Sequence, residues 1–335
     1  MVKYLKIDIA AHILPIKYKQ VLDKEAPGHI QQNINNRVRS LWDLECRMRI
    51  MDKYEVLHVL TLSRPPIEEV IHNPNKALDF ARLANDEMAE LVAKYPEKFP
   101  AAVASVALNN IDGSLKELER AITQLHLRGV QIYTHVNHKP LDSPDFEPLW
   151  EMMSNYDLPI WIHPTHGVTS VDYKGEEGSK YASASLFGWP YETTLAMTRI
   201  VFGRIFERWP TLKFITHHAG GMVPFYAERI KAFHDFHEMT LGETYIRGMR
   251  RSPIEYYKMF YTDTAIYGNS LGLMLARSFF GTDHLLFGTD FPFAGQNGER
   301  VTRQTIQAIE EMLISEEEKK MIYEENARKI MRLPI

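Results

Sequence analysis

Short apolar runs alternate with longer amphipathic segments along the whole chain. Eight of the runs are short, continuous and apolar, as expected for parallel strands that are covered on both faces. They span residues 4–10, 56–62, 101–108, 129–133, 159–162, 212–216, 260–264 and 285–289. Segments with helical spacing of apolar residues separate them, most clearly 76–95, 113–125, 146–155, 192–209, 223–237 and 271–280, and residues 303–331 supply at least two more helices. A strand followed by a helix, repeated eight times, predicts one α/β domain over residues 1–335 with the (β/α)₈ architecture of a TIM barrel.

Three connections are too long to be simple turns. Residues 13–41 follow the first predicted strand, residues 166–190 follow the fifth, and residues 238–259 precede the seventh. Long loops in compact domains usually bind ligands or close over a site. We therefore predict long inserted loops after strands 1 and 5 on the catalytic face, and a third segment that supports assembly.

A histidine or an aspartate stands at the end of several apolar runs. His12 follows the first, His163 the fifth, His218 the sixth and Asp290 the eighth. The carboxyl ends of the strands of a TIM barrel meet at one mouth, so these side chains can converge although they lie far apart in sequence. A single histidine at a strand end is more often a hydrogen-bonded core residue. Histidine or aspartate at the ends of four predicted strands instead predicts a site for one divalent metal ion. Zinc is expected first, with manganese or iron as alternatives.

Charge and composition exclude several classes of partner. The formal net charge is −4, from 39 basic and 43 acidic residues that are well mixed, so neither nucleic acid nor an anionic membrane surface is expected as a partner. No apolar run approaches the ~18 residues of a membrane-spanning helix, and Lys3, Lys6 and Asp8 interrupt the N-terminal region where a signal sequence would be apolar. Cys46 is the only cysteine, which is typical of a reducing compartment. We expect a soluble cytoplasmic protein.

Four segments carry a resemblance to a known family. Residues 7–15, 162–164, 218–225 and 288–293 resemble segments of the amidohydrolase-2 family, and the resemblance extends over essentially the whole chain. That family includes aminocarboxymuconate-semialdehyde, γ-resorcylate and 5-carboxyvanillate decarboxylases. The resemblance implies a metal-dependent barrel enzyme and a homodimer.

The same resemblance assigns roles to single residues. It implies that His163 and Asp290 are metal ligands, that His12 is the second histidine of a His-x-His pair, and that His218 is a further ligand or a contact to the substrate. Neighbouring residues of a strand point to opposite faces, so we expect His217 to pack toward the helices.

One position departs from the family pattern. The first histidine of the His-x-His pair is Ala10 here, which offers no donor atom. We favour an ion held by His12, His163 and Asp290, with or without His218. Affinity for the metal should then be weaker than in a relative that has both histidines.

Two other interpretations of Ala10 stay open. A neighbouring group, Asp8, His166 or His217, could replace the lost ligand. Alternatively, the chain could be a metal-poor, non-catalytic subunit that stabilises an active paralogue in a hetero-oligomer.

Several further residues are candidates for contact with a substrate. Arg47 and Arg49 lie in a segment that resembles the family segment with a substrate-carboxylate arginine, and a guanidinium matches a carboxylate with two hydrogen bonds. A solvated helix face is the competing interpretation for both. His166, just beyond strand 5, is expected to contact the substrate or to lie on the rim. Asp263 is expected to support the strand-7 turn or to orient a ligand, and Arg229 also matches a family arginine.

We predict a carbon–carbon lyase that removes CO₂ without oxidation from a small aromatic or otherwise unsaturated carboxylic acid. The ion would act as Lewis acid and template, and Asp290 or His218 would protonate the carbon that loses the carboxylate. Hydrolysis of a lactone or an amide, with Asp290 as general base, is an alternative because the same constellation serves both reactions. Oxidative chemistry at a redox-active ion and the non-catalytic subunit are the remaining alternatives.

Overall fold

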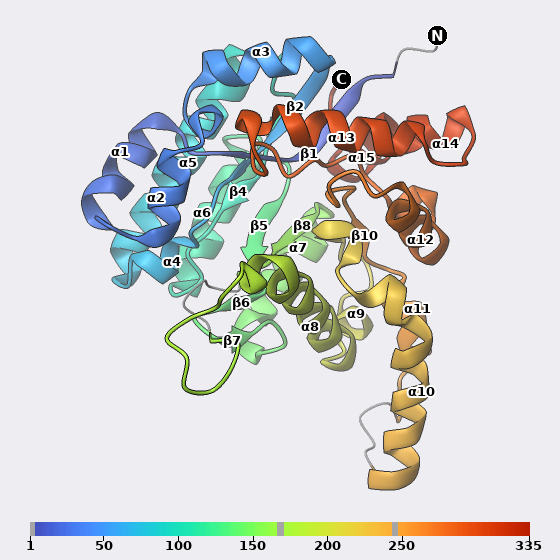
Figure 1. Ribbon diagram of the computed structural model, residues 1–335. Helices are drawn as coiled ribbons and strands as arrows, with labels where there is room; N and C mark the ends of the chain where they lie inside the picture. The colour runs from blue at the N-terminus through green and yellow to red at the C-terminus, as the bar shows by residue number, and fades with distance from the viewer. Residues whose placement is uncertain (1–3, 166–170, 243–246) are drawn as a thin grey trace.

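The computed structural model describes residues 4–165, 171–242 and 247–335 and shows a parallel barrel surrounded by helices (Figure 1). The barrel strands are β1 (Lys6–Ile13), β2 (Val56–Leu62), β3 (Ala101–Ala102), β4 (Ala104–Ser105), β5 (Val130–Tyr133), β8 (Ile160–His163), β9 (Phe214–Thr216) and β10 (Tyr261–Thr262). They pair in parallel in the orders β1–β2–β3 and β4–β5–β8–β9–β10. Val103 joins β3 to β4 at one barrel position, because its N–H donates to the Leu60 carbonyl at 2.9 Å.

Residues 285–291 close the barrel between β10 and β1. The Leu286 N–H donates to the Thr262 carbonyl at 2.9 Å, and the Ile9 N–H donates to the Phe287 carbonyl at 3.0 Å. The predicted eighth strand therefore lies where it was expected, but it forms isolated bridges rather than a regular strand. The predicted (β/α)₈ barrel is confirmed.

The other strands differ from prediction mainly at their ends. β1 continues to Ile13, and its register with β2 is irregular between Asp8 and Ala11. The predicted strand 101–108 ends at Ser105, because the Asn85 side chain accepts from the Ser105 N–H at 2.8 Å and donates to its carbonyl at 3.1 Å. A side chain thus replaces the neighbouring strand there.

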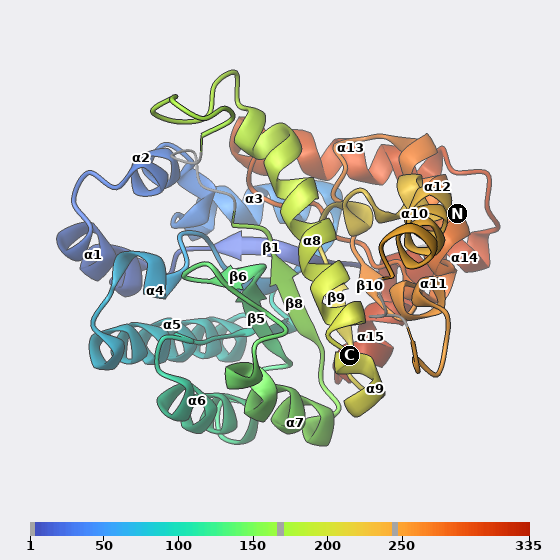
Figure 2. The ribbon, with the colours of Figure 1, turned by 90° about the horizontal axis from the view of Figure 1, so that it is seen from below.

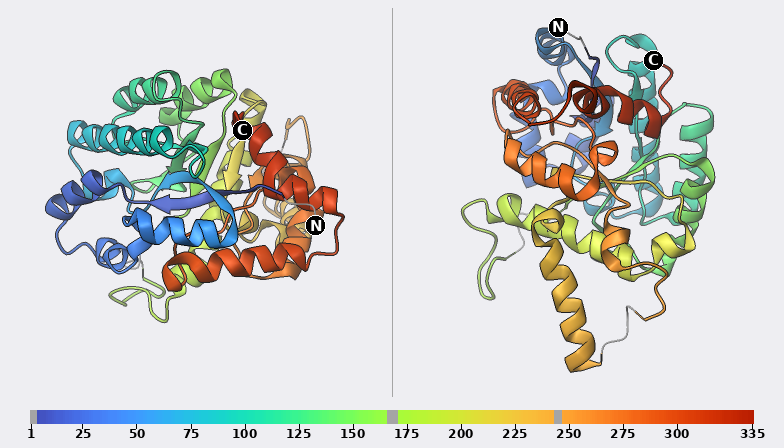
Figure 3. Two further views of the ribbon diagram at one scale, coloured as in Figure 1. Left: turned by 90° about the horizontal axis from the view of Figure 1, so that it is seen from above. Right: turned by 90° about the vertical axis from the view of Figure 1, so that its right-hand side faces the viewer.

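Helices cover the outside of the barrel (Figure 3). The predicted ones are α5 (Pro74–Lys94), α6 (Ile111–Thr123), α7 (Glu147–Tyr156), α8 (Trp189–Phe202), α9 (Ile205–Arg208), α10 (Val223–Leu241), α12 (Ser270–Phe280), α13 (Glu299–Glu310), α14 (Glu316–Lys320) and α15 (Asn326–Met331). The predicted helix 192–209 is divided into α8 and α9, because Arg204 adopts a left-handed φ of +59°. Within the described residues, no helix is both long enough and apolar enough to span a bilayer.

The connection after β1 is helical, which corrects the prediction of a long loop there. It contains α1 (Ile16–Glu25) and α2 (Ile30–Asn36), and α3 (Leu44–Tyr54) follows before β2. Residues 166–170 of the connection after β8 lie outside the described residues, and the part from 171 onward extends to one side of the barrel (Figure 2).

Further short elements lie in three of the connections. They are α4 (Ile67–Val70) after β2, the hairpin β6 (His135–Val136) and β7 (Lys139–Pro140) after β5, and α11 (Pro253–Tyr257) before β10.

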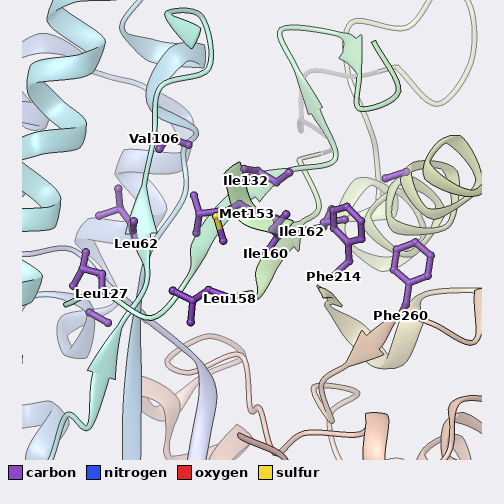
Figure 4. Close-up of a cluster of buried hydrophobic side chains, with 14 of the residues drawn as sticks. Leu62, Val106, Leu127, Ile132, Met153, Leu158, Ile160, Ile162, Phe214 and Phe260 are labelled. Carbon is purple, nitrogen blue, oxygen red and sulfur yellow. The ribbon is translucent and has the colours of Figure 1, made fainter. Parts of the chain in front are cut away.

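Two apolar layers follow from the alternation of side chains along the strands. Ile160 and Ile162 of β8 share one buried cluster with helix residues such as Met153 of α7 (Figure 4). Trp161, between them, points into the barrel and belongs to a second cluster with Ile215 and other inward residues of the strands. The floor of the barrel is therefore filled with apolar side chains, and the next inward positions toward the carboxyl ends are polar.

Candidate metal centre

Three predicted metal ligands converge at the mouth of the barrel. His12 on β1, His163 at the end of β8 and Asp290 in the closing segment offer ligand atoms that all lie within 4.8 Å of one another. His12 Nε2 is 3.2 Å from Asp290 Oδ1, and the ring centroids of His12 and His163 are 5.0 Å apart. Three protein ligands are what a catalytic ion with an open coordination position needs.

The second nitrogen of each histidine fixes its orientation. His12 Nδ1 lies 2.9 Å from Thr61 Oγ1 on β2, and His163 Nδ1 lies 2.7 Å from the carbonyl oxygen of Pro164. A proton on His163 Nδ1 donates to that carbonyl and leaves Nε2 as a ligand atom. His12 Nε2 is buried and has no hydrogen-bond partner among the described residues, which is unfavourable unless a cation accepts its lone pair. The residues therefore fit a divalent ion.

His217 also lies at this centre, which corrects the expectation that it packs toward the helices. Ile215 of β9 points into the barrel, and two residues later His217 points the same way. The His217 ring is 4.7 Å from that of His163, and its Nδ1 is 3.0 Å from Asp263 Oδ2. Asp263 therefore orients a histidine of the centre, one of the two roles expected for it.

His218 reaches the centre by a different route. β9 ends at Thr216, and His218 has a left-handed φ of +58°, so the alternation of a strand no longer applies there. Its side chain returns to the mouth, where Nε2 lies 3.8 Å from Asp290 Oδ2. The Trp189 ring lies nearly parallel to the imidazole, with 6.2 Å between centroids. The early end of the strand explains why both adjacent histidines face one site.

Asp290 is surrounded by donors. The Tyr267 hydroxyl donates to Asp290 Oδ2 at 2.5 Å. Burial alone raises the pKa of the Asp290 carboxyl, but His12 and His218 hold that pKa well below its ordinary value. Burial alone lowers the pKa of the His218 imidazole, but Asp290 raises it above the ordinary value. Each member of this pair therefore favours the charged form of the other.

Ala10 lies in the apolar floor of the barrel. It is fully buried in the same cluster as Trp161, whose indole N–H donates to the Ile9 carbonyl at 3.0 Å. The backbones of Ala10 and Gly288 approach closely, since a Cβ added to Gly288 would lie 3.1 Å from the Ala10 Cβ. A larger side chain at position 10 would have to displace residues of this buried cluster.

The groups considered as replacements for the missing ligand differ in availability. Both oxygens of Asp8 are occupied, because Oδ1 accepts from the backbone of Ala10 and Thr289 and Oδ2 accepts from the Thr289 hydroxyl. His166 lies outside the described residues. His217 Nε2 is buried beside the three ligands and finds no hydrogen-bond partner in the part of the chain that the structure describes. The structure thus favours His217 over Asp8 as an additional donor.

Arg47 is buried and uses its donors within the protein. Its guanidinium contacts the carbonyls of Ser40 and His12, and Nη1 lies 3.0 Å from His58 Nδ1. Burial lowers the pKa of Arg47 to about 9. Through the carbonyl of His12, Arg47 fixes the end of β1. Arg49 instead lines a hollow beside α3, away from the three ligands.

Arg64 and Tyr267 are residues of the centre that were not predicted. Arg64 lies with its guanidinium 4.9 Å from the centroid of Trp189, and that ring is 6.4 Å from His163. Arg64 and Tyr267 both stand in connections outside the helices and strands, where no periodic pattern predicts the direction of a side chain. A usable signal existed for Arg64, which stands two residues after the end of β2.

A cavity of about 440 Å³ lies beside the centre and is lined by Glu69, Thr134, Thr165 and other residues after the strand ends. Thr165 is two residues beyond His163, and its hydroxyl donates to Glu69 Oε2 at 3.4 Å. Among the described residues, no metal ligand lines this cavity. The cavity is therefore separate from the cluster of ligand atoms.

Comparisons with known proteins find relatives in sequence and in fold. The 2-amino-3-carboxymuconate-6-semialdehyde decarboxylase of Dictyostelium discoideum is 28% identical over 92% of this chain and 86% of its own length. A 2,6-dihydroxybenzoate decarboxylase complexed with 2,6-dihydroxybenzoate superposes with a TM-score of 0.83 at 24% identity, over 99% of this chain and 100% of that chain. A dihydroxybenzoic acid decarboxylase from Polaromonas, with bound manganese and the inhibitor 2-nitroresorcinol, has a TM-score of 0.79 at 24% identity, over 99% and 98% of the two chains.

The family model described as Amidohydrolase matches residues 7–333, which is nearly the whole chain. The predicted resemblance is thereby confirmed, and the chain belongs to the amidohydrolase family.

Proposed function

We propose that this protein is a metal-dependent decarboxylase that releases CO₂, without oxidation, from an aromatic or otherwise unsaturated carboxylic acid. The observation that carries the proposal is the position of Asp290 between two groups. Its Oδ1 faces His12 Nε2 at 3.2 Å within the ligand cluster, and its Oδ2 faces His218 Nε2 at 3.8 Å. The decarboxylases to which the chain is similar support the substrate class.

Different residues would perform different steps of the reaction. His12, His163 and Asp290 would hold a divalent ion, which when bound supplies a Lewis acid for the substrate carboxylate and a neighbouring oxygen. A proton on His218 Nε2, which faces Asp290 Oδ2 at 3.8 Å, would pass to the carbon that bears the carboxylate. A C–H bond forms there, the C–C bond breaks, and its electron pair returns to the unsaturated system as CO₂ leaves. Tyr267 keeps Asp290 Oδ2 turned toward His218.

A substrate panel tests the proposal. The protein, loaded with Mn²⁺ or Zn²⁺, should release one CO₂ for each molecule of acid consumed with at least one member of a panel of hydroxybenzoates and picolinate-like acids. Turnover of lactones or amides without CO₂ would replace the proposal with hydrolysis. Purified protein that binds no divalent metal and turns over nothing would instead support the non-catalytic subunit.

We propose one divalent ion for each chain. Two imidazoles and a carboxylate suit zinc, as the sequence predicts, whereas the manganese in the Polaromonas relative supports manganese. Elemental analysis of protein purified without added metal, followed by activity with each ion, separates the two.

We also propose that residues 1–335 form one domain and that the protein acts in the cytoplasm. Cys46 is unpaired, which supports a reducing compartment.

A homodimer is the assembly we propose, formed through α10. This helix extends away from the barrel (Figures 1 and 3). It exposes large apolar side chains, including Phe225 at 74% and Met239 at 85% of their surface. Exposed patches of this kind mark protein interfaces, where aromatic residues and methionine are enriched.

Light scattering on a Phe236→Asp, Met239→Asp variant tests this interface. The dimer dissociation constant should rise by at least about tenfold, as expected for loss of central apolar contacts. Leu313→Asp is the matched control, since Leu313 is 91% exposed outside α10 and should leave the dimer intact. An unchanged dimer in the α10 variant would place the interface elsewhere.

A further inference from the structure

Arg64 is a buried cation next to the metal centre. It follows β2 by two residues, and 8% of its surface is exposed. The Asn35 side-chain amide donates to the Arg64 carbonyl at 2.6 Å, so α2 fixes the backbone of this residue. Its guanidinium lies over Trp189, which in turn lies beside His163 and His218. The position of Arg64 is therefore determined from two sides, by α2 and by the first residue of α8.

The guanidinium makes no hydrogen bond and no ion pair with any described residue. Its Nε is buried without a partner. Asp290, Glu69 and Tyr133 act on it only electrostatically, and burial lowers the pKa of Arg64. Arg47 is the contrast within the same protein, because its guanidinium contacts two carbonyls and a histidine. A buried guanidinium with unused donors is costly unless an anion pairs with it.

We infer that Arg64 binds the carboxylate of the substrate and so selects anionic aromatic acids; this inference rests on the proposed function. The planar guanidinium offers two parallel N–H donors that match the two oxygens of a carboxylate. The Trp189 ring holds the guanidinium plane in place by a cation–π contact. The carboxylate would then lie between Arg64 and the metal ligands, and the carbon that bears it would face the His218–Asp290 pair.

The chemistry predicts which kinetic constant depends on Arg64. The carboxylate loses its negative charge as CO₂ forms, so an arginine on that group stabilises the bound substrate at least as much as the transition state. Loss of Arg64 should therefore raise KM and change kcat much less. A residue that only supported the fold would not produce this division.

The binding of two ligands to wild type and to an Arg64 variant tests the inference with a readout other than CO₂ release. Manganese-loaded wild type and Arg64→Met are titrated by calorimetry with 2,6-dihydroxybenzoate and with 2,6-dihydroxybenzamide, the neutral analogue of similar shape. The dissociation constant of the acid should rise by about 10- to 100-fold in Arg64→Met, the loss of a charge-assisted pair, and that of the amide by less than about threefold. The dissociation constant of the acid for Arg64→Lys should lie between those for wild type and Arg64→Met, because lysine keeps the positive charge but not the two parallel N–H donors.

Arg300→Met is the matched control, since Arg300 is exposed on α13, and it should bind both ligands as wild type does. Equal losses for acid and amide in Arg64→Met, or no loss for either, would overturn the inference. Wild type that binds the acid through Arg64 but releases no CO₂ would contradict the decarboxylase and leave the anion site standing. Wild type that binds neither this acid nor any other in the panel would overturn the inference as well.

Discussion

Replacing Asp290 with asparagine should lower kcat/KM for decarboxylation by about 10²- to 10⁴-fold, the range for loss of an acid–base group. Asparagine keeps the shape of the side chain and can still accept from the Tyr267 hydroxyl. It removes the charge that faces His12 Nε2 at 3.2 Å and His218 Nε2 at 3.8 Å. Both the ligand set and the proton-transfer pair are therefore weakened by one change. Steady-state kinetics with saturating metal measure the effect.

The same substitution on the surface provides the comparison. Asp283 has a side chain that is 61% exposed, so Asp283→Asn should retain full activity. Tyr267→Phe should show an intermediate loss, because it removes one hydrogen bond to Asp290 and leaves the charge in place. If Asp290→Asn kept most of its activity with an unchanged circular dichroism spectrum, the assigned site would be wrong.

The barrel could be predicted because its strands are apolar on both faces. Residues 56–62 were predicted as a strand, and β2 has these bounds. Residues 285–289 were also apolar, yet they form no regular strand. The chain there must turn into the mouth, and Asp290 has a left-handed φ of +62°. The hydrophobic pattern of a segment indicates that it is buried but not which backbone angles it adopts. It therefore identifies residues 285–289 as part of the barrel and does not show that their strand pairing is irregular.

The sequence was sufficient to predict which residues at the strand ends form the candidate site. His12, His163 and Asp290 converge as expected because the barrel brings the carboxyl ends of its strands together. The direction of His217 was missed, since alternation along β9 had to be combined with the left-handed turn at His218. Arg64 was missed although it stands two residues after β2, because a linear pattern does not show that its donors remain unused after folding.

The second large effect is expected at Ala10, where the family pattern has a histidine. Ala10→His should lower the free energy of unfolding by about 1–3 kcal/mol, because an imidazole overpacks a floor already filled by Trp161. Trp161→Leu alone should cost about 2–4 kcal/mol through the cavity it leaves. In the double variant the two changes compensate, so the combined loss should be smaller than their sum by about 0.5–3 kcal/mol. Urea unfolding of the four proteins measures this coupling.

Metal affinity gives an independent measurement on the same proteins. With Trp161 reduced, a histidine at position 10 can approach the ion held by His12 and His163, and the affinity should rise by at least about tenfold. Trp150→Leu is the matched control, because Trp150 is equally buried but belongs to the cluster between barrel and helices. It should show no coupling to Ala10→His. Full stability of Ala10→His with Trp161 intact would mean that the floor has room for the ligand, and the absence of histidine at position 10 would then need a functional rather than a steric reason.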